Sequence, residues 1–287
     1  MRLSLGTPQL GLCYGVNNTT GMLDPVQAYE VLHAAHDAGF TMVDTSTDYG
    51  DALDRIGNYL RYYPGAFDVV AKYHGTLPAE KIRELKAHCD MRIPGGVGHH
   101  VLWTAGATNI AELDPDLAEG VTVYTVEEAE SVPDGFSMIQ VPASILDGRM
   151  DEEIKELQKR GKTVFVRSML LQGLIAADPA TGPAGTNGNP KLKAAAAPYL
   201  EGLRGVAEAY DMSVVELAVR WAWEIFPDVV IFGAETPEQA HQIGEYWGRG
   251  ALPEGAVSAA RVVRKGIPEL VISPRMWKQT YDFTVTK

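Results

Sequence analysis

Short apolar runs alternate along this chain with stretches in which apolar residues recur at helical spacing. This alternation is typical of βα units and predicts a parallel sheet. Eight runs are predicted as strands: residues 3–5 or 9–12, 41–44, 67–72, 99–103, 120–124, 137–141, 163–168 and 229–232. A chain of 287 residues is also the usual size of one (β/α)8 barrel. We find no repeat of fixed period and no linker, so residues 1–287 are expected to form a single barrel domain.

Helix signals follow several of these runs. Asp24-Pro25 is a typical helix start, an N-cap followed by proline in the first turn, and Gly39 is a typical end. Further helices are predicted over residues 51–62 and 78–88.

Two segments depart from a regular barrel. Residues 104–119 leave scarcely enough room for a crossover helix between the fourth and fifth strands. Residues 178–190 are rich in glycine and proline and follow the seventh strand, on the face where barrel active sites lie. Both a mobile lid and an ordinary surface loop fit this composition.

Candidate chemistry lies at the ends of the second and third strands. The second strand ends at Asp44, Tyr49 follows five residues later, and the third strand ends at Lys72. Adjacent parallel strands would bring these side chains to one rim. There a lysine would lower the pKa of the tyrosine, and the aspartate would hold the lysine charged. This set suits proton donation to a carbonyl oxygen as hydride arrives. The alternatives are a loop-capping acid, a buried tyrosine and a surface lysine.

These motifs resemble the aldo-keto reductase family. The segments that carry the resemblance occur in the family's order between about residues 1 and 248: 5–18, 44–50, Lys72, 136–142, 164–174 and 229–239. The resemblance implies a (β/α)8 barrel and NAD(P)-dependent oxidoreduction of a small molecule. It assigns Asp44, Tyr49 and Lys72 to catalysis.

The resemblance also implies cofactor-binding residues. Gln140 matches the amide that holds the nicotinamide carboxamide, and Thr122 stands where the family has serine. Val123 replaces the usual asparagine, so one carboxamide contact is expected to be lost. Arg167 and Ser168 match a bacterial variant in which arginine replaces the aromatic residue that stacks on nicotinamide.

The last motif concerns the cofactor phosphates. Gly233, Thr236 and Gln239 match the turn and helix start that hold phosphate in the family. Glu235 and Glu238 are anionic, however, and Gln239 replaces a basic residue. NAD is therefore expected to bind at least as well as NADP, and both remain candidate cofactors.

One family residue is missing from its expected place. Aldo-keto reductases usually carry a histidine at the end of the fourth strand, where this chain has Trp103-Thr104. His99 and His100 precede the apolar run, so we expect them at the opposite rim. Either Tyr49 acts without the histidine, or the barrel performs other chemistry.

Composition bears on binding partners, cellular location and metal sites. A net charge of −12 and the absence of a basic stripe disfavour nucleic acid and anionic membranes. No signal peptide or membrane-length apolar run is visible, and two cysteines predict free thiols in a reducing cytoplasm. His33 and His36 lack partners at metal-ligand spacing, so no metal site is expected.

The leading prediction is therefore a cytoplasmic NAD- or NADP-dependent oxidoreductase acting on a small carbonyl or alcohol. One alternative is a repurposed barrel that uses Asp44, Tyr49 and Lys72 for isomerisation or elimination. A second alternative is a non-catalytic ligand-binding barrel. Nicotinamide binding distinguishes the leading prediction from both.

Overall fold

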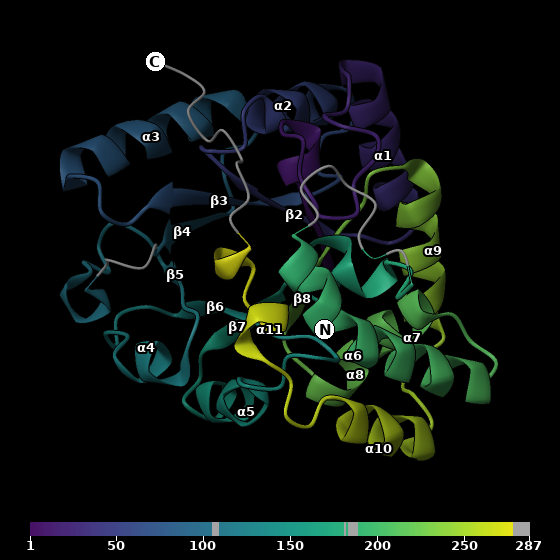
Figure 1. Ribbon diagram of the computed structural model, residues 1–287. Helices are drawn as coiled ribbons and strands as arrows, with labels where there is room; N and C mark the ends of the chain where they lie inside the picture. The colour runs from purple at the N-terminus through teal and green to yellow at the C-terminus, as the bar shows by residue number, and fades with distance from the viewer. Residues whose placement is uncertain (105–108, 181, 183–188, 278–287) are drawn as a thin grey trace.

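Eight parallel strands form a closed barrel in chain order in the computed structural model, which describes residues 1–104, 109–180, 182 and 189–277 (Figure 1). The strands are β1 Arg2–Gly6, β2 Met42–Ser46, β3 Asp68–His74, β4 His99–Trp103, β5 Gly120–Thr122, β6 Met138–Pro142, β7 Thr163–Arg167 and β8 Val229–Gly233. The predicted barrel is confirmed. Of the two candidates for the first strand, residues 9–12 are wrong, because residues 8–10 form a 3-10 turn.

Helices surround the strands (Figure 1). They are α1 Pro25–Asp37, α2 Ala52–Tyr62, α3 Ala79–Arg92, α4 Val126–Glu130, α5 Asp151–Lys159, α6 Pro190–Ala209, α7 Val214–Arg220, α8 Ala222–Ile225, α9 Pro237–Gly248, α10 Glu254–Val263 and α11 Glu269–Ile272. The 3-10 turns are η1 Pro8–Leu10, η2 Ile110–Glu112, η3 Leu171–Ala176 and η4 Pro274–Met276. The predicted start of α1 is confirmed: the Asp24 carboxylate accepts hydrogen bonds from the amides of Val26 and Gln27.

Both irregular connections lie partly outside the described residues. Between β4 and β5 the described part of the chain contains only the short turn η2, as the tight spacing predicted. Residues 105–108 lie outside the description. In the predicted loop 178–190, Asp178 pairs with Gly182 in an antiparallel bridge, and residues 181 and 183–188 are not described.

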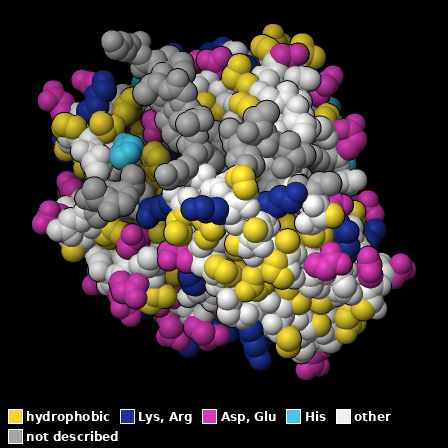
Figure 2. All heavy atoms as spheres, in the orientation of Figure 1, with side chains coloured by type: hydrophobic (Ala, Val, Ile, Leu, Met, Phe, Trp, Pro, Cys, Tyr) yellow, Lys and Arg dark blue, Asp and Glu magenta, His cyan; other side chains and the backbone are white. Residues whose placement is uncertain are grey.

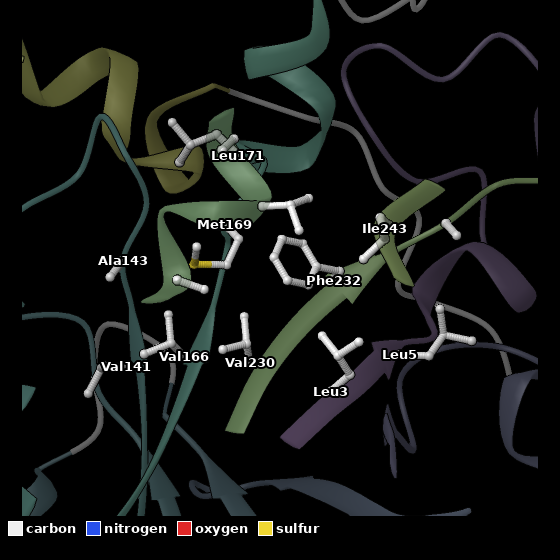
Figure 3. Close-up of a cluster of buried hydrophobic side chains, with 14 of the residues drawn as sticks. Leu3, Leu5, Val141, Ala143, Val166, Met169, Leu171, Val230, Phe232 and Ile243 are labelled. Carbon is white, nitrogen blue, oxygen red and sulfur yellow. The ribbon is translucent and has the colours of Figure 1, made fainter. Parts of the chain in front are cut away.

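The core has two layers because side chains alternate along each strand. Outward-facing side chains pack under the helices; Figure 3 shows Leu3 of β1 beside Val230 and Phe232 of β8. Inside the barrel lies a separate apolar cluster: Met42, Val70, Val101, Met138, Phe165, Val229 and Ile231. Two residues beyond Met42 and Val70, on the same inward side, come Asp44 and Lys72. The barrel interior therefore changes from apolar to polar toward the carboxyl ends of the strands.

Two further predictions concern the chain as a whole. Cys13 is exposed and Cys89 is buried, and both are free thiols, as the composition predicted. Within the described ranges, no helix has the length and apolar character needed to cross a bilayer.

Candidate active site

Asp44 lies at the centre of a buried polar cluster. Its Oδ1 atom accepts a hydrogen bond from Lys72 Nζ, and its Oδ2 atom lies 2.8 Å from Gln140 Nε2. Asp44 and Lys72 are each 4% exposed, and Gln140 is fully buried. The barrel thus brings together the ends of β2, β3 and β6. Burial lowers the pKa of Lys72, and the adjacent Asp44 carboxylate opposes that shift.

Gln140 has one polar atom left over. Its amide nitrogen donates to Asp44, while its Oε1 atom is buried with no partner among the described residues. The Oε1 atom of Gln9, on η1, is also buried and has no hydrogen-bond partner among the described residues. Buried acceptors without donors are uncommon in folded proteins. Both glutamines line one cavity, so it offers two acceptors to a bound amide.

Two glycines set the position of Tyr49, in the loop after β2. A side chain at Gly11 would come within 2.0 Å of the Tyr49 carbonyl oxygen. Gly50 has a φ of +51°, which favours glycine. These two loops therefore approach each other more closely than larger residues would allow. This packing holds the tyrosine ring at the rim of the barrel.

The Tyr49 ring lies beside the buried ion pair. Lys72 Nζ is 5.3 Å from the ring centroid, over the ring face. Burial raises the pKa of Tyr49 well above its ordinary value, the Asp44 charge raises it further, and the Arg167 charge opposes the shift. The sequence-based expectation that a lysine lowers this pKa is therefore outweighed by burial. The Tyr49 hydroxyl stays protonated at neutral pH, as a proton donor must.

A cavity of about 810 Å³ opens at the carboxyl ends of the strands. Asp44, Tyr49 and Lys72 all line it. Five of the seven predicted cofactor-binding residues also line this cavity: Gln140, Arg167, Ser168, Gly233 and Gln239.

The other two candidates make local contacts and do not line the cavity. Thr122 Oγ1 accepts a hydrogen bond from the Thr104 amide at 3.0 Å. Thr236 caps α9 by accepting from the Gln239 amide at 3.3 Å.

The fourth strand ends at Trp103, which lines the cavity and donates from Nε1 to the Tyr124 hydroxyl at 2.8 Å. His99 and His100 lie at the start of β4 and do not line the cavity. His99 pairs with Asp68 at 3.2 Å, and His100 Nδ1 is 2.8 Å from the Tyr73 hydroxyl. These two imidazoles occupy the amino-terminal rim.

His99→Gln should leave turnover unchanged and alter the pH dependence of stability. Hydrogen bonds to Asp68 and Glu119 raise the pKa of His99 from 6.5 to about 9. A raised pKa means that the folded state binds the proton more tightly, so the stabilisation is complete below pH 6.5. It is lost as pH rises toward 9, and we expect a loss of about 1–3 kcal/mol. Urea unfolding of both proteins at pH 6 and pH 9.5 measures this; an identical loss in His99→Gln would exclude His99 as its source.

Tyr124 and Arg275 are among the cavity residues that were not identified from the sequence. Tyr124 follows β5, and the guanidinium carbon of Arg167 lies 4.2 Å from its ring centroid. Arg275, on η4, lies 3.1 Å from the same centroid. The two-residue period of β5 extends from Thr122 to Tyr124 and was a usable signal for the tyrosine. Arg275 lies beyond the family-like segments, and no sequence pattern points to it.

Backbone strain is concentrated after β7. Ser168, Leu171 and Gln172 have φ values of 66°, 46° and 55°, in the left-handed region that side chains disfavour. Ser168 and Gln172 line the cavity. Such conformations gather at functional sites in proteins, which agrees with a binding role for this turn.

The segment after β8 brings one acidic side chain, Glu235, to the cavity. Glu235 and Gln239 line it, and the Glu235 amide donates to Gln239 Oε1 at 2.8 Å. Burial raises the pKa of Glu235. Gly233 leaves room for Gln9, because a side chain at 233 would come within 2.6 Å of Gln9 Nε2.

The chain is similar to one known protein family. The sequence model described as "Aldo/keto reductase family" matches residues 118–261, half of the chain. No curated protein sequence matches the chain significantly.

Solved structures show the same fold at low identity. A glycerol dehydrogenase from Gluconobacter oxydans is 20% identical with a TM-score of 0.71, and the match covers 91% of this chain and 90% of that one. An aldo-keto reductase from Klebsiella pneumoniae in complex with NADPH is 17% identical, with a TM-score of 0.67 and the same coverage. The holo form of an aldo-keto reductase from Bacillus halodurans is 16% identical with a TM-score of 0.69, and 91% of each chain is covered.

Proposed function

Because the chain belongs to the aldo/keto reductase family, we propose that it is a nicotinamide-dependent oxidoreductase acting on a carbonyl or alcohol group of a small molecule. The observation that carries this proposal is the cluster of Asp44, Lys72 and Tyr49 in one cavity with Gln140. The NADPH complex of the Klebsiella structure supports the choice of cofactor class.

The proposed reduction needs a hydride at the carbonyl carbon and a proton at its oxygen. A bound reduced nicotinamide supplies the hydride. Tyr49 donates the proton, since burial keeps its hydroxyl protonated until the oxygen gains negative charge. Lys72 then stabilises the tyrosinate, and Asp44 keeps the ammonium in place. Oxidation of an alcohol reverses these roles.

The cavity suits the carboxamide end of such a cofactor. A carboxamide NH2 group needs acceptors, and the Oε1 atoms of Gln140 and Gln9 are buried without a partner among the described residues. Ser168, Gly233 and Gln239 line the cavity around them. We assign the cofactor to these residues, with Thr236 ordering the start of α9.

Fluorescence titration with NADH and NADPH tests the proposal. Quenching with micromolar affinity, weakened by Gln140→Leu and unchanged by Gln158→Leu, would support it. Gln158 is the matched control because its amide bonds to Phe226 on the outside of the barrel. Absence of binding to either cofactor would reject the proposal and favour the non-redox barrel or the ligand-binding barrel.

Glu235→Gln should improve NADPH affinity about three- to tenfold and leave NADH affinity nearly unchanged. The substitution removes an anion that lines the cavity, and a nearby charge in this partly solvated setting is worth about 1 kcal/mol. Glu238→Gln is the matched control, since Glu238 does not line the cavity. Titration of each variant with both cofactors measures the effect. Equal gains in NADPH affinity from the two substitutions would show that the cavity position of Glu235 does not weaken NADPH binding.

A further inference from the structure

Two arginines from distant parts of the chain converge on one tyrosine. Arg167, at the end of β7, and Arg275, on η4, place their guanidinium carbons 4.2 and 3.1 Å from the Tyr124 ring centroid. Trp103 fixes the ring from β4 by donating to its hydroxyl. All four side chains line the cavity, and in Figure 1 η4 lies in front of the barrel opening.

Neither guanidinium has a carboxylate partner among the described residues. Arg167 donates to Val123 O at 3.2 Å and Ser168 Oγ at 3.4 Å, and Arg275 donates to Thr104 O at 3.5 Å. Arg149, by contrast, lines the same cavity but forms an ion pair with the buried Asp147, with 2.8 Å between Arg149 Nη2 and Asp147 Oδ2. Glu235 and Glu269 also line the cavity and form no ion pair with either arginine.

The chain carries 37 acidic and 25 basic residues, so neighbouring cations without acids are unexpected. Figure 2 shows acidic side chains spread over much of this face, with a short row of Lys and Arg across its middle, over the region of η4. Burial alone would raise the pKa of Tyr124. The charges of Arg167 and Arg275 and the Trp103 hydrogen bond outweigh burial, and that pKa is lowered. Among the described residues, the two guanidinium charges therefore dominate the surroundings of Tyr124.

We propose that Arg167 and Arg275 together bind an anionic oxygen group, a carboxylate or a phosphate, on the substrate. Guanidinium groups suit both anions, because their fork of N–H donors matches two oxygens. The proposal rests on the proposed function, since it names the substrate class of the same cavity. It also gives Arg167 a role other than the cofactor contact implied by the family resemblance.

The position of the arginines favours the substrate over the cofactor phosphates. The Arg167 charge acts on both Tyr49 and Lys72, so Arg167 lies near the proton-donating group. Glu235 and Gln239, where the family resemblance implies phosphate contacts, follow β8 instead. The substrate is thus a small oxo or hydroxy compound that carries an anionic group. In the proposed reduction, Tyr49 would give the proton to the carbonyl oxygen, a nicotinamide bound beside it would supply the hydride, and the anionic group would stay unchanged.

Calorimetry with succinate, the neutral succinamide and inorganic phosphate tests the site without any turnover. We expect succinate or phosphate to bind and succinamide not to bind. Arg275→Gln and Arg167→Gln should each weaken anion binding about tenfold or more, as loss of a charge-assisted hydrogen bond predicts. Arg275→Lys should restore part of it. Arg61→Gln, on the exposed side of α2, is the control for the change in net charge.

Turnover with matched carbonyl compounds separates the sources of the anion. Succinic semialdehyde is compared with butanal, and glyceraldehyde 3-phosphate with glyceraldehyde. A preference for the charged member of either pair, lost in Arg275→Gln, supports the subsite and identifies its anion. Anion binding that both arginine variants leave intact would overturn the proposed subsite. So would arginine variants that lose affinity for NADPH but keep their affinity for the anion.

The two proposals can fail separately. Nicotinamide binding without any anion preference would leave the oxidoreductase proposal standing and remove the subsite. If the protein binds succinate through its arginines but binds no nicotinamide, the subsite would stand and the oxidoreductase proposal would fall.

Discussion

Lys72→Met is expected to lower the free energy of unfolding by about 3–5 kcal/mol, because it leaves the Asp44 carboxylate buried without its cation. Asp44 is 4% exposed, and among the described residues its carboxylate would keep only the Gln140 amide as a partner. Turnover should fall as well, since tyrosinate at position 49 would lose the ammonium beside its ring. Urea unfolding followed by circular dichroism measures the stability change.

Two comparisons isolate the effect of burial. Lys155→Met removes a lysine that pairs with Glu152 on the surface, at 2.9 Å, and should cost less than about 1 kcal/mol. Adding Asp44→Asn to Lys72→Met should recover part of the loss, because an amide can still accept from Gln140 without a buried charge. Equal costs for the two lysine substitutions would contradict a desolvated ion pair.

Tyr49→Phe is expected to reduce turnover by on the order of 10²-fold or more, the usual contribution of a positioned general acid. Cofactor affinity and unfolding free energy should change little, because the substitution removes only the hydroxyl and keeps the ring. Steady-state kinetics with the best substrate, together with NADPH titration, separates chemistry from binding.

Tyr73→Phe provides the matched control on the neighbouring strand. Its hydroxyl contacts His100, on the outer side of β3, and does not line the cavity. We expect a loss of about 1 kcal/mol in stability and unchanged turnover. Near-normal turnover in Tyr49→Phe would remove Tyr49 from the mechanism.

The barrel could be predicted from sequence because its determinants are local. Each strand is a short apolar run, and the helix starts carry their own signals, as Asp24 does for α1. The partnership of Asp44 and Lys72 was also predictable, because neighbouring parallel strands deliver their ends to one rim. Gln140 was assigned to the cofactor, but its contact with Asp44 was not foreseen, because it crosses the barrel.

The cationic part of the cavity was not predictable for a physical reason. Arg275 meets Tyr124 only after the whole barrel has formed and η4 has returned to its opening. No periodicity relates two residues so far apart. The net direction of the pKa shift of Tyr49 was not predictable for a similar reason: a strand-end motif shows which charges are near, but the extent of burial depends on packing by remote loops.

The two hydrogen-bond partners of the Asp44 carboxylate also suggest the order in which its contacts form during folding. Its partner Lys72 lies 28 residues away, whereas Gln140 lies 96 residues away on the far side of the barrel. Contacts between distant residues form later, because closing a longer loop costs more entropy. A chain of this size commonly folds through intermediates. A half-formed barrel can therefore already hold the charged pair while it still lacks the amide that completes it. On refolding, we therefore expect secondary structure to recover first and the contact between Asp44 and Gln140 to complete as a separate, slower event.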